Sequence, residues 1–105
     1  MMPRLIVHER AVDDVTEIAN FIAEQHLGAA LRFYDAAQAA FAFLSQNPGA
    51  GPAFDPPLPA DETLRFWPIT RYRNYLVIYR PVDQGVQVLR VLQGARDIRS
   101  MFRGA

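Results

Sequence analysis

The chain has 105 residues and no cysteine, so the sequence offers neither a disulfide framework nor a thiolate metal site. Half of the residues are apolar, which is enough for the core of one domain spanning residues 1–105. The apolar run 5–7 is too short for an export signal and no run is long enough to cross a bilayer, so we expect a cytoplasmic protein without a membrane partner.

The overall charge is zero, but the two halves of the chain differ strongly in charge. Residues 1–62 carry three arginines and nine acidic residues, a net charge of −6. Residues 63–105 carry eight arginines and two acidic residues, a net charge of +6. This asymmetry favours an anionic partner for the second half, or internal neutralisation between an acidic helical half and a basic sheet half.

The first elements are a short strand and a helix. The β-branched segment Arg4 to His8 predicts a strand. From Val12 to Gln25 apolar residues recur with helical spacing. Three acidic residues, Asp13, Asp14 and Glu17, fall in the first turns of this expected helix, where carboxylates complement the helix dipole.

A second helix is expected from about Ala29 to Gln46, after an interruption at Gly28. Phe43 lies off its apolar stripe, which indicates either packing on two sides or an apolar spot for a partner. Residues Asn47 to Thr63 contain five prolines and two glycines, so this segment is expected to be a long, stiff connection. Connections of this length are uncommon within a domain, so we expect it to have a role or to pack over the core.

Three strands are predicted in the last part of the chain: Leu64 to Ile69, Asn74 to Arg80 and Val86 to Gln93. Pro68 places the end of the first of these at a sheet edge or a bulge. Pro81 to Gly85 is expected to form the hairpin loop between the other two. The order β-α-α-β-β-β, followed by a short tail, predicts an α+β fold with a helical hairpin packed on a mostly antiparallel four-stranded sheet.

Several short phrases, in this order, resemble the ParE/RelE family of bacterial toxins. They are AVDDVxEIAxFIA at residues 11–23, LSQNPG at 44–49, LR at 64–65, YLVIYR at 75–80 and VLRVLQGARD at 88–97. Each phrase is weak alone, but their order and spacing are specific, and the similarity is greatest to the ParE branch, the plasmid-stabilisation toxins of type II toxin–antitoxin modules.

The resemblance implies one of two activities. RelE-like members are ribosome-dependent mRNA endonucleases, which need proton-transfer groups and cations around the reacting phosphate. ParE-like members inhibit DNA gyrase by binding and have no assigned hydrolytic site. The expected partner is a ParD-like antitoxin with a ribbon-helix-helix N-terminus and a disordered C-terminal half, which forms a hetero-oligomer with the toxin.

Residues at the positions of a RelE-like site favour the ParE reading. Gln93 stands where many members have His, and glutamine does not exchange a proton near neutral pH. Phe102 stands where those nucleases place a tyrosine, and Leu76 where they carry an arginine. Arg96 is the one clear match and Arg65 the one cation left on the preceding strand. We therefore predict no catalytic residues and no enzyme; a RelE-like endonuclease and a non-toxic antitoxin-binding relative remain the alternatives.

The two histidines do not suggest another chemistry. His8 and His26 lie outside the family phrases and are interpreted as surface or capping residues, and the scattered acids do not have the spacing of metal ligands. No metal and no cofactor is predicted.

Two binding surfaces are predicted instead. The antitoxin is expected to bind exposed aromatic and basic residues: Phe21, Phe43, Arg65, Trp67, Arg73 and Arg80. The gyrase-facing element is expected to be the tail: Arg96, Arg99, Met101, Phe102 and Arg103. Two other interpretations of the arginines stay open, namely internal ion pairs with acids of the helices and stacking of single-stranded nucleic acid on the sheet.

Overall fold

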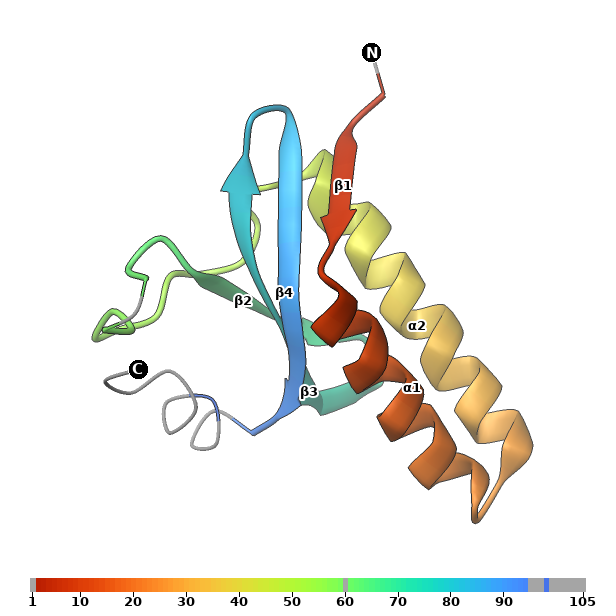
Figure 1. Ribbon diagram of the computed structural model, residues 1–105. Coiled ribbons are helices and arrows are strands. Elements are labelled where there is room, and N and C mark those ends of the chain that lie inside the picture. Colours follow the sequence, from red (N-terminus) through yellow and green to blue (C-terminus); the bar gives the residue numbers. More distant parts are fainter. Residues whose placement is uncertain (1, 60, 95–97, 99–105) are drawn as a thin grey trace.

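The computed structural model describes residues 2–59, 61–94 and 98. The elements are β1 (Arg4–Val7), α1 (Glu9–Ala23), α2 (Leu27–Gln46), β2 (Arg65–Ile69), β3 (Tyr72–Val82) and β4 (Gly85–Gln93). The two helices form an antiparallel hairpin on one side of a four-stranded sheet (Figure 1). This confirms the predicted α+β fold and its element order. Among the described residues, the helices are too short or too polar to cross a membrane.

The strand order in the sheet is β1-β4-β3-β2. The first and last strands, β1 and β4, pair in parallel, with Arg4 opposite Gly85, and the helical hairpin, β2 and β3 lie between them in the chain. The other two pairs are antiparallel. Gly85 is needed at its position because a Cβ there would overlap the carbonyl of Arg4.

The helices begin earlier than predicted, because each is capped by a histidine. The backbone N–H of Arg10 donates to Nδ1 of His8 (3.1 Å), so α1 starts at Glu9 rather than Val12. The backbone N–H of Ala29 donates to Nδ1 of His26 (3.0 Å), so α2 starts at Leu27. The predicted capping role of both histidines is therefore confirmed.

Gly28, expected to interrupt the helices, and Asp14, expected in the first turn of α1, both have other positions. Gly28 lies inside the first turn of α2 and does not break it. Glu9 is the acidic residue in the first turn of α1, whereas Asp14 lies one turn further on and is buried against β4. A carboxylate placed there serves tertiary contacts rather than the helix dipole.

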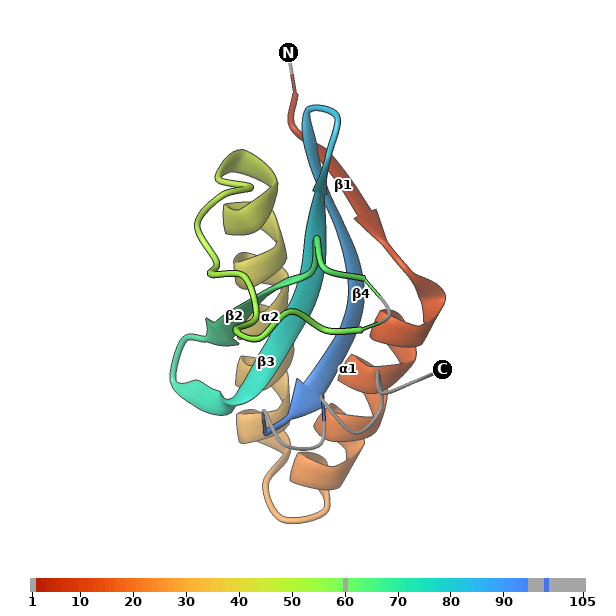
Figure 2. The same cartoon turned by 90° about the vertical axis from the view of Figure 1, so that its left-hand side faces the viewer.

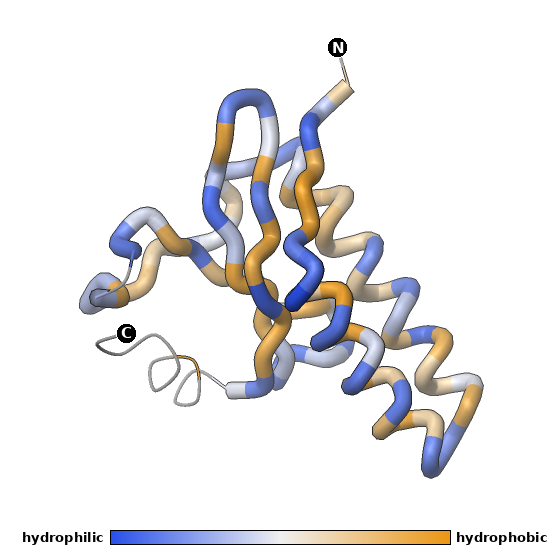
Figure 3. The backbone as a smooth tube through the Cα atoms, in the orientation of Figure 1, coloured by the Kyte–Doolittle hydropathy of each residue, from blue (hydrophilic) through white to orange (hydrophobic). Residues whose placement is uncertain are grey.

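The sheet is covered on both faces. The helices cover one face, where the main core includes Phe33, Phe41 and Val77. A second buried cluster lies on the other face and consists of Phe54, Leu58, Leu64, Leu76, Ile78 and Ile98. Consecutive residues of β3 from Leu76 to Tyr79 are buried for this reason, whereas hydrophobic and hydrophilic colours alternate along much of the sheet in Figure 3.

The proline-rich segment covers the second face, as Figure 2 shows for the chain between α2 and β2. The hydroxyl of Tyr79 holds this segment by donating to the carbonyl of Pro48 (3.0 Å) and accepting from the N–H of Gly51 (2.8 Å). Phe54 and Leu58 of the same segment belong to the second cluster. The expected packing over the core is confirmed, and it explains why so long a connection is ordered.

Strand ends in the sheet partly differ from prediction. β3 starts at Tyr72 and continues through Pro81, so the turn to β4 is only the pair Asp83–Gln84, and the predicted five-residue hairpin loop was wrong. Gln84 has a φ of 64°, as a residue of a tight turn often does. The expectation for Pro68 is confirmed, since β2 is an edge strand and its register shifts after Pro68.

Candidate functional site

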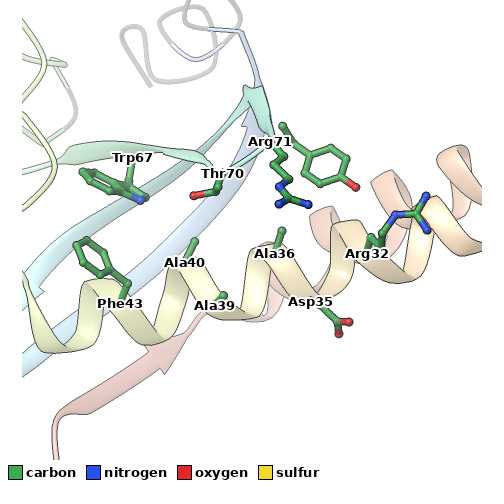
Figure 4. A pocket seen from close by; sticks show the side chains of 10 residues that line it. Arg32, Asp35, Ala36, Ala39, Ala40, Phe43, Trp67, Thr70 and Arg71 are labelled. Carbon is green, nitrogen blue, oxygen red and sulfur yellow. The ribbon is translucent and has the colours of Figure 1, made fainter.

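A groove with a volume of about 660 Å³ lies between α2 and the β2–β3 turn. Figure 4 shows the side chains that line it. They are Arg32, Asp35, Ala36, Ala39, Ala40, Phe43, Trp67, Thr70, Arg71 and Tyr72. The set joins one flank of α2 to residues of the sheet that follow it by about thirty positions in the sequence.

The floor of the groove is made by alanines. Ala36, Ala39 and Ala40 recur at helical spacing, so their methyl groups lie on one flank of α2 and leave space where larger side chains would fill it. A hollow with such a floor suits the apolar face of a protein segment.

An aromatic pair closes one end of the groove. The rings of Phe43 and Trp67 stack with centroids 5.2 Å apart and an interplanar angle of 25°. Phe43 still exposes 43% of its surface. Of the two predicted alternatives, packing on two sides is confirmed, because Phe43 packs on the sheet, and part of its ring also stays exposed.

The other end of the groove is basic. Arg71 stands in the β2–β3 turn with a φ of 72°, and Arg32 extends from α2 on the same side. Neither guanidinium forms an ion pair with any residue that the structure describes. Asp35 also borders the groove, but its carboxylate points away from the sheet in Figure 4. The groove therefore combines an apolar floor with two guanidinium groups that no described carboxylate pairs with, which fits a segment that is apolar and acidic.

The residues predicted to bind the antitoxin divide between several places. Phe43 and Trp67 meet in the groove, whereas Arg73 is exposed on β3 and does not line the groove. Phe21 is 65% exposed on α1 and lies outside the groove.

Arg65 and Arg80 make internal contacts instead. Arg65 donates through Nη1 to the carbonyl of Gly51 (2.6 Å). Arg80 forms an ion pair with Asp61 (3.1 Å) and donates through Nε to Gln87 (3.0 Å). Hydrogen bonds to Thr63, and then the guanidinium of Arg80, lower the pKa of Asp61 below its ordinary value. These arginines hold the proline-rich segment and the sheet together.

Several residues of the groove were not predicted, above all Arg32, Arg71 and the three alanines. The alanines at positions i, i+3 and i+4 of an otherwise aromatic-rich helix were the available sequence signal. That spacing does not show which residues of the sheet the alanines lie opposite.

A second hollow of about 350 Å³ lies between α1 and the end of β4. Its lining includes Phe21, Tyr75 and Gln93. Within it, Asp14 accepts from Nε and Nη2 of Arg90 (2.8 and 3.0 Å) and from the backbone N–H of Val91 (2.9 Å).

The contact between Asp14 and Arg90 gives this arginine a structural role. The hydrogen bonds that Arg90 donates to Asp14 raise the pKa of Arg90 above its ordinary value, so the guanidinium stays charged. The side chains of Asp14 and Arg90 are only 9% and 16% exposed. The alternative prediction, pairing between an acid of the helices and an arginine of the sheet, is confirmed here and ties α1 to β4.

The predicted gyrase-facing residues Arg96, Arg99, Met101, Phe102 and Arg103 lie outside the described residues. Ile98, within the same stretch, is described and is completely buried in the second cluster. Across the described part of the chain, no three His, Asp or Glu side chains gather closely enough to hold a metal ion.

Comparisons with known proteins identify the family. The family model described as "ParE toxin of type II toxin-antitoxin system, parDE" matches residues 5–98. A solved structure titled "Chromosomal ParDE TA system from P. aeruginosa" has the same fold, with a TM-score of 0.71 and 20% sequence identity over 89% of this chain and 97% of that chain. No curated protein matches the sequence. Since the family model spans nearly all of the fold, the chain belongs to the ParE family of toxins from type II toxin–antitoxin systems.

Proposed function

We propose that this toxin inhibits DNA gyrase by binding it, and that a ParD-like antitoxin neutralises the toxin by occupying the groove between α2 and the β2–β3 turn. Membership of the ParE family supports the target. The single observation that supports the docking site is the groove itself. Its apolar floor and its stacked aromatic pair lie beside Arg32 and Arg71, and neither arginine forms an ion pair within the described part of the chain.

The lining of the groove determines which antitoxin segment it suits. The antitoxin's C-terminal half, disordered when free, would fold against the groove and place an apolar side chain on the Phe43–Trp67 pair. An Asp or Glu further along the segment would reach Arg32 and Arg71 at the other end. Apolar contact supplies most of the affinity in this arrangement, and the arginines fix the register.

The arrangement of the remaining side chains supports binding rather than hydrolysis. Arg65 is the one cation expected on the strand before Leu76, the position at which RelE-like nucleases carry an arginine. Its guanidinium is held by the carbonyl of Gly51. Arg90 is held by Asp14. Gln93, at the end of β4, is exposed and has no proton to exchange near neutral pH. We therefore propose that the toxin is not an enzyme.

Two parallel assays test the activity. Purified toxin is added to gyrase supercoiling reactions and, separately, to translating ribosomes with primer extension on the message. We expect supercoiling to stop, the antitoxin to restore it, and the message to stay intact. Cleavage inside codons with supercoiling unaffected would establish the endonuclease instead, and no response in either assay despite tight antitoxin binding would establish a non-toxic relative.

A further inference from the structure

One residue that follows β4 is fixed in the interior of the fold. Ile98 is completely buried, and it belongs to the second cluster together with Phe54 and Leu58 of the proline-rich segment. Asp97 and Arg99 flank it in the sequence, so Ile98 is a single apolar side chain in a charged stretch. Because neighbouring Cα atoms are only about 3.8 Å apart, burial of this side chain holds the chain close to the second cluster at this point.

The second cluster is enclosed from two sides. Its sheet side includes Leu76 and Ile78 of β3. The other side comes from the proline-rich segment, which crosses the sheet in Figure 2 and contributes Phe54 and Leu58, only 6% and 2% exposed. A sheet face alone covers an apolar side chain on one side, so the complete burial of Ile98 depends on a second layer, which the proline-rich segment supplies.

The proline-rich segment is itself held on the sheet at both of its ends. Near its start, Gly51 donates its N–H to the hydroxyl of Tyr79 (2.8 Å) and accepts from Nη1 of Arg65 (2.6 Å). A side chain at Gly51 would overlap a backbone carbonyl of β2, so only glycine permits this close approach. Near its end, Asp61 forms an ion pair with Arg80 (3.1 Å). The prolines between these two points stiffen the part of the segment that enters the second cluster.

The second cluster is separate from the groove between α2 and the β2–β3 turn. Among the described residues, no member of the cluster lines that groove. The helices do not need the cluster either, because their apolar sides pack on the first face of the sheet in the main core. An antiparallel sheet can leave its other face to water when that face is polar. Here the other face is apolar instead, and it holds the proline-rich segment and Ile98.

We propose that Phe54, Leu58 and Ile98 are positioning residues for inhibition: together they hold the C-terminal segment against the sheet, so that residues 96–103 are presented to the target in one arrangement. The inference rests on the proposed function, in which the toxin acts by binding gyrase, and on the sequence-based prediction that residues 96–103 face gyrase. Holding a segment in place before it binds lowers the entropy that binding costs. The three residues thereby increase the affinity for the target without contacting the target themselves.

Limited proteolysis of the full chain tests whether Ile98 holds the segment. Trypsin cleaves after arginine, so Arg96 and Arg99 report on the chain beside Ile98, and the exposed Arg71 and Arg73 are internal controls near the start of β3. Ile98→Ala should speed cleavage after Arg96 and Arg99 at least about tenfold, because cleavage follows the fraction of molecules in which the segment is locally detached. Cleavage after Arg71 and Arg73, followed by mass spectrometry in the same samples, should not change.

Supercoiling and antitoxin assays on the same variants test whether this hold matters for inhibition. Ile98→Ala and Leu58→Ala should each raise the toxin concentration for half-maximal inhibition of gyrase at least about tenfold, and should leave antitoxin affinity within about threefold of the wild type. Ile98→Val, which removes one methyl group, should show smaller changes of the same kind in both proteolysis and inhibition.

Leu44→Ala is the matched control. Leu44 has the same side chain as Leu58 and is also completely buried, but it lies in the main core. Toxin concentrations are corrected for the folded fraction from circular dichroism, so that a general loss of stability does not count as a loss of inhibition. Folded Leu44→Ala should inhibit gyrase like the wild type, and it should not favour cleavage after Arg96 and Arg99 over cleavage after Arg71 and Arg73.

Three results would overturn the proposal. They are unchanged cleavage beside Ile98 in Ile98→Ala, faster cleavage there without any loss of gyrase inhibition, and the same pattern of cleavage and inhibition in Leu44→Ala. A wild-type toxin that does not inhibit gyrase would refute the proposed function and, with it, the role of the three residues in inhibition. The proteolysis result would still show whether Ile98 holds the segment, so the two failures are distinguishable.

Discussion

Replacing Phe43 by alanine separates the groove's role in binding from its role in folding. Phe43 is 43% exposed and stacks on Trp67 at 5.2 Å, so it is only half inside the protein. A buried Phe→Ala change costs about 3–5 kcal/mol, and half of that, about 2 kcal/mol, is the expected loss of stability for a half-exposed ring. The variant should therefore remain folded, since small domains have about 5–15 kcal/mol of stability.

The expected effect on antitoxin binding is larger than the effect on folding. An aromatic anchor residue of an interface contributes about 2–4 kcal/mol, which corresponds to a loss of affinity of about 30- to 700-fold for Phe43→Ala. The measurement is the dissociation rate of the ParD-like antitoxin by biolayer interferometry, because changes of this kind appear mostly in dissociation. Leu5→Ala is the control, since Leu5 is similarly exposed (40%) but lies on β1 away from the groove.

Melting temperature and circular dichroism on the same samples decide how the result is interpreted. A folded Phe43→Ala protein that binds the antitoxin within about threefold of the wild type would show that the groove is not the docking site. An equal loss of antitoxin affinity in Leu5→Ala would show that the effect is not specific to the groove.

Three further changes test other parts of the structure. Ala39→Trp places a large ring on the floor of the groove and should weaken antitoxin binding at least about tenfold. Gyrase inhibition should stay intact, because the ring fills only the space in which the antitoxin docks. Supercoiling assays with and without antitoxin measure both effects. Asp14→Ala leaves Arg90 and the N–H of Val91 without their acceptor and should cost about 2–4 kcal/mol in urea unfolding, and a cost below about 1 kcal/mol would refute the role of this contact in joining α1 to β4. Tyr79→Phe should cost about 1–2 kcal/mol at neutral pH through its two lost hydrogen bonds. Burial raises the pKa of Tyr79. The contribution of its hydroxyl to the free energy of unfolding is therefore fully present below the unfolded pKa of 10.0 and is lost as pH rises through the higher folded pKa. Unfolding measured at increasing pH should show this loss in the wild type and not in Tyr79→Phe.

Local chemistry determined the element order and several details of the fold. The helical and alternating periods predicted every helix and strand, and Pro68 predicted the sheet edge, because a proline has no N–H to give to a neighbouring strand. Helix starts were misplaced because a histidine cap is an uncommon signal, and its action depends on the orientation of one ring nitrogen.

The structure of the candidate site was less predictable from the sequence. Phe43 and Trp67 were both expected to bind a partner, and they are neighbours in the groove. Arg65 and Arg80 were expected beside them, but the fold uses both to hold the proline-rich segment over the second face of the sheet. A sequence shows that an arginine is present, but the contact it makes depends on which distant carbonyl or carboxylate the fold brings near.

By itself, then, the sequence determined the family, the α+β order and the separation of acidic from basic halves. These depend on residue type and on spacing along the chain, which local conformational preferences translate directly into helices and strands. Only the tertiary structure decided that α2 has two exposed flanks, one lined by Ala39 and Arg71 and the other by Leu31 and Tyr34. The physical reason is that a binding surface is made where elements distant in sequence pack together, and the side chains left unpaired by that packing are the ones available to a partner.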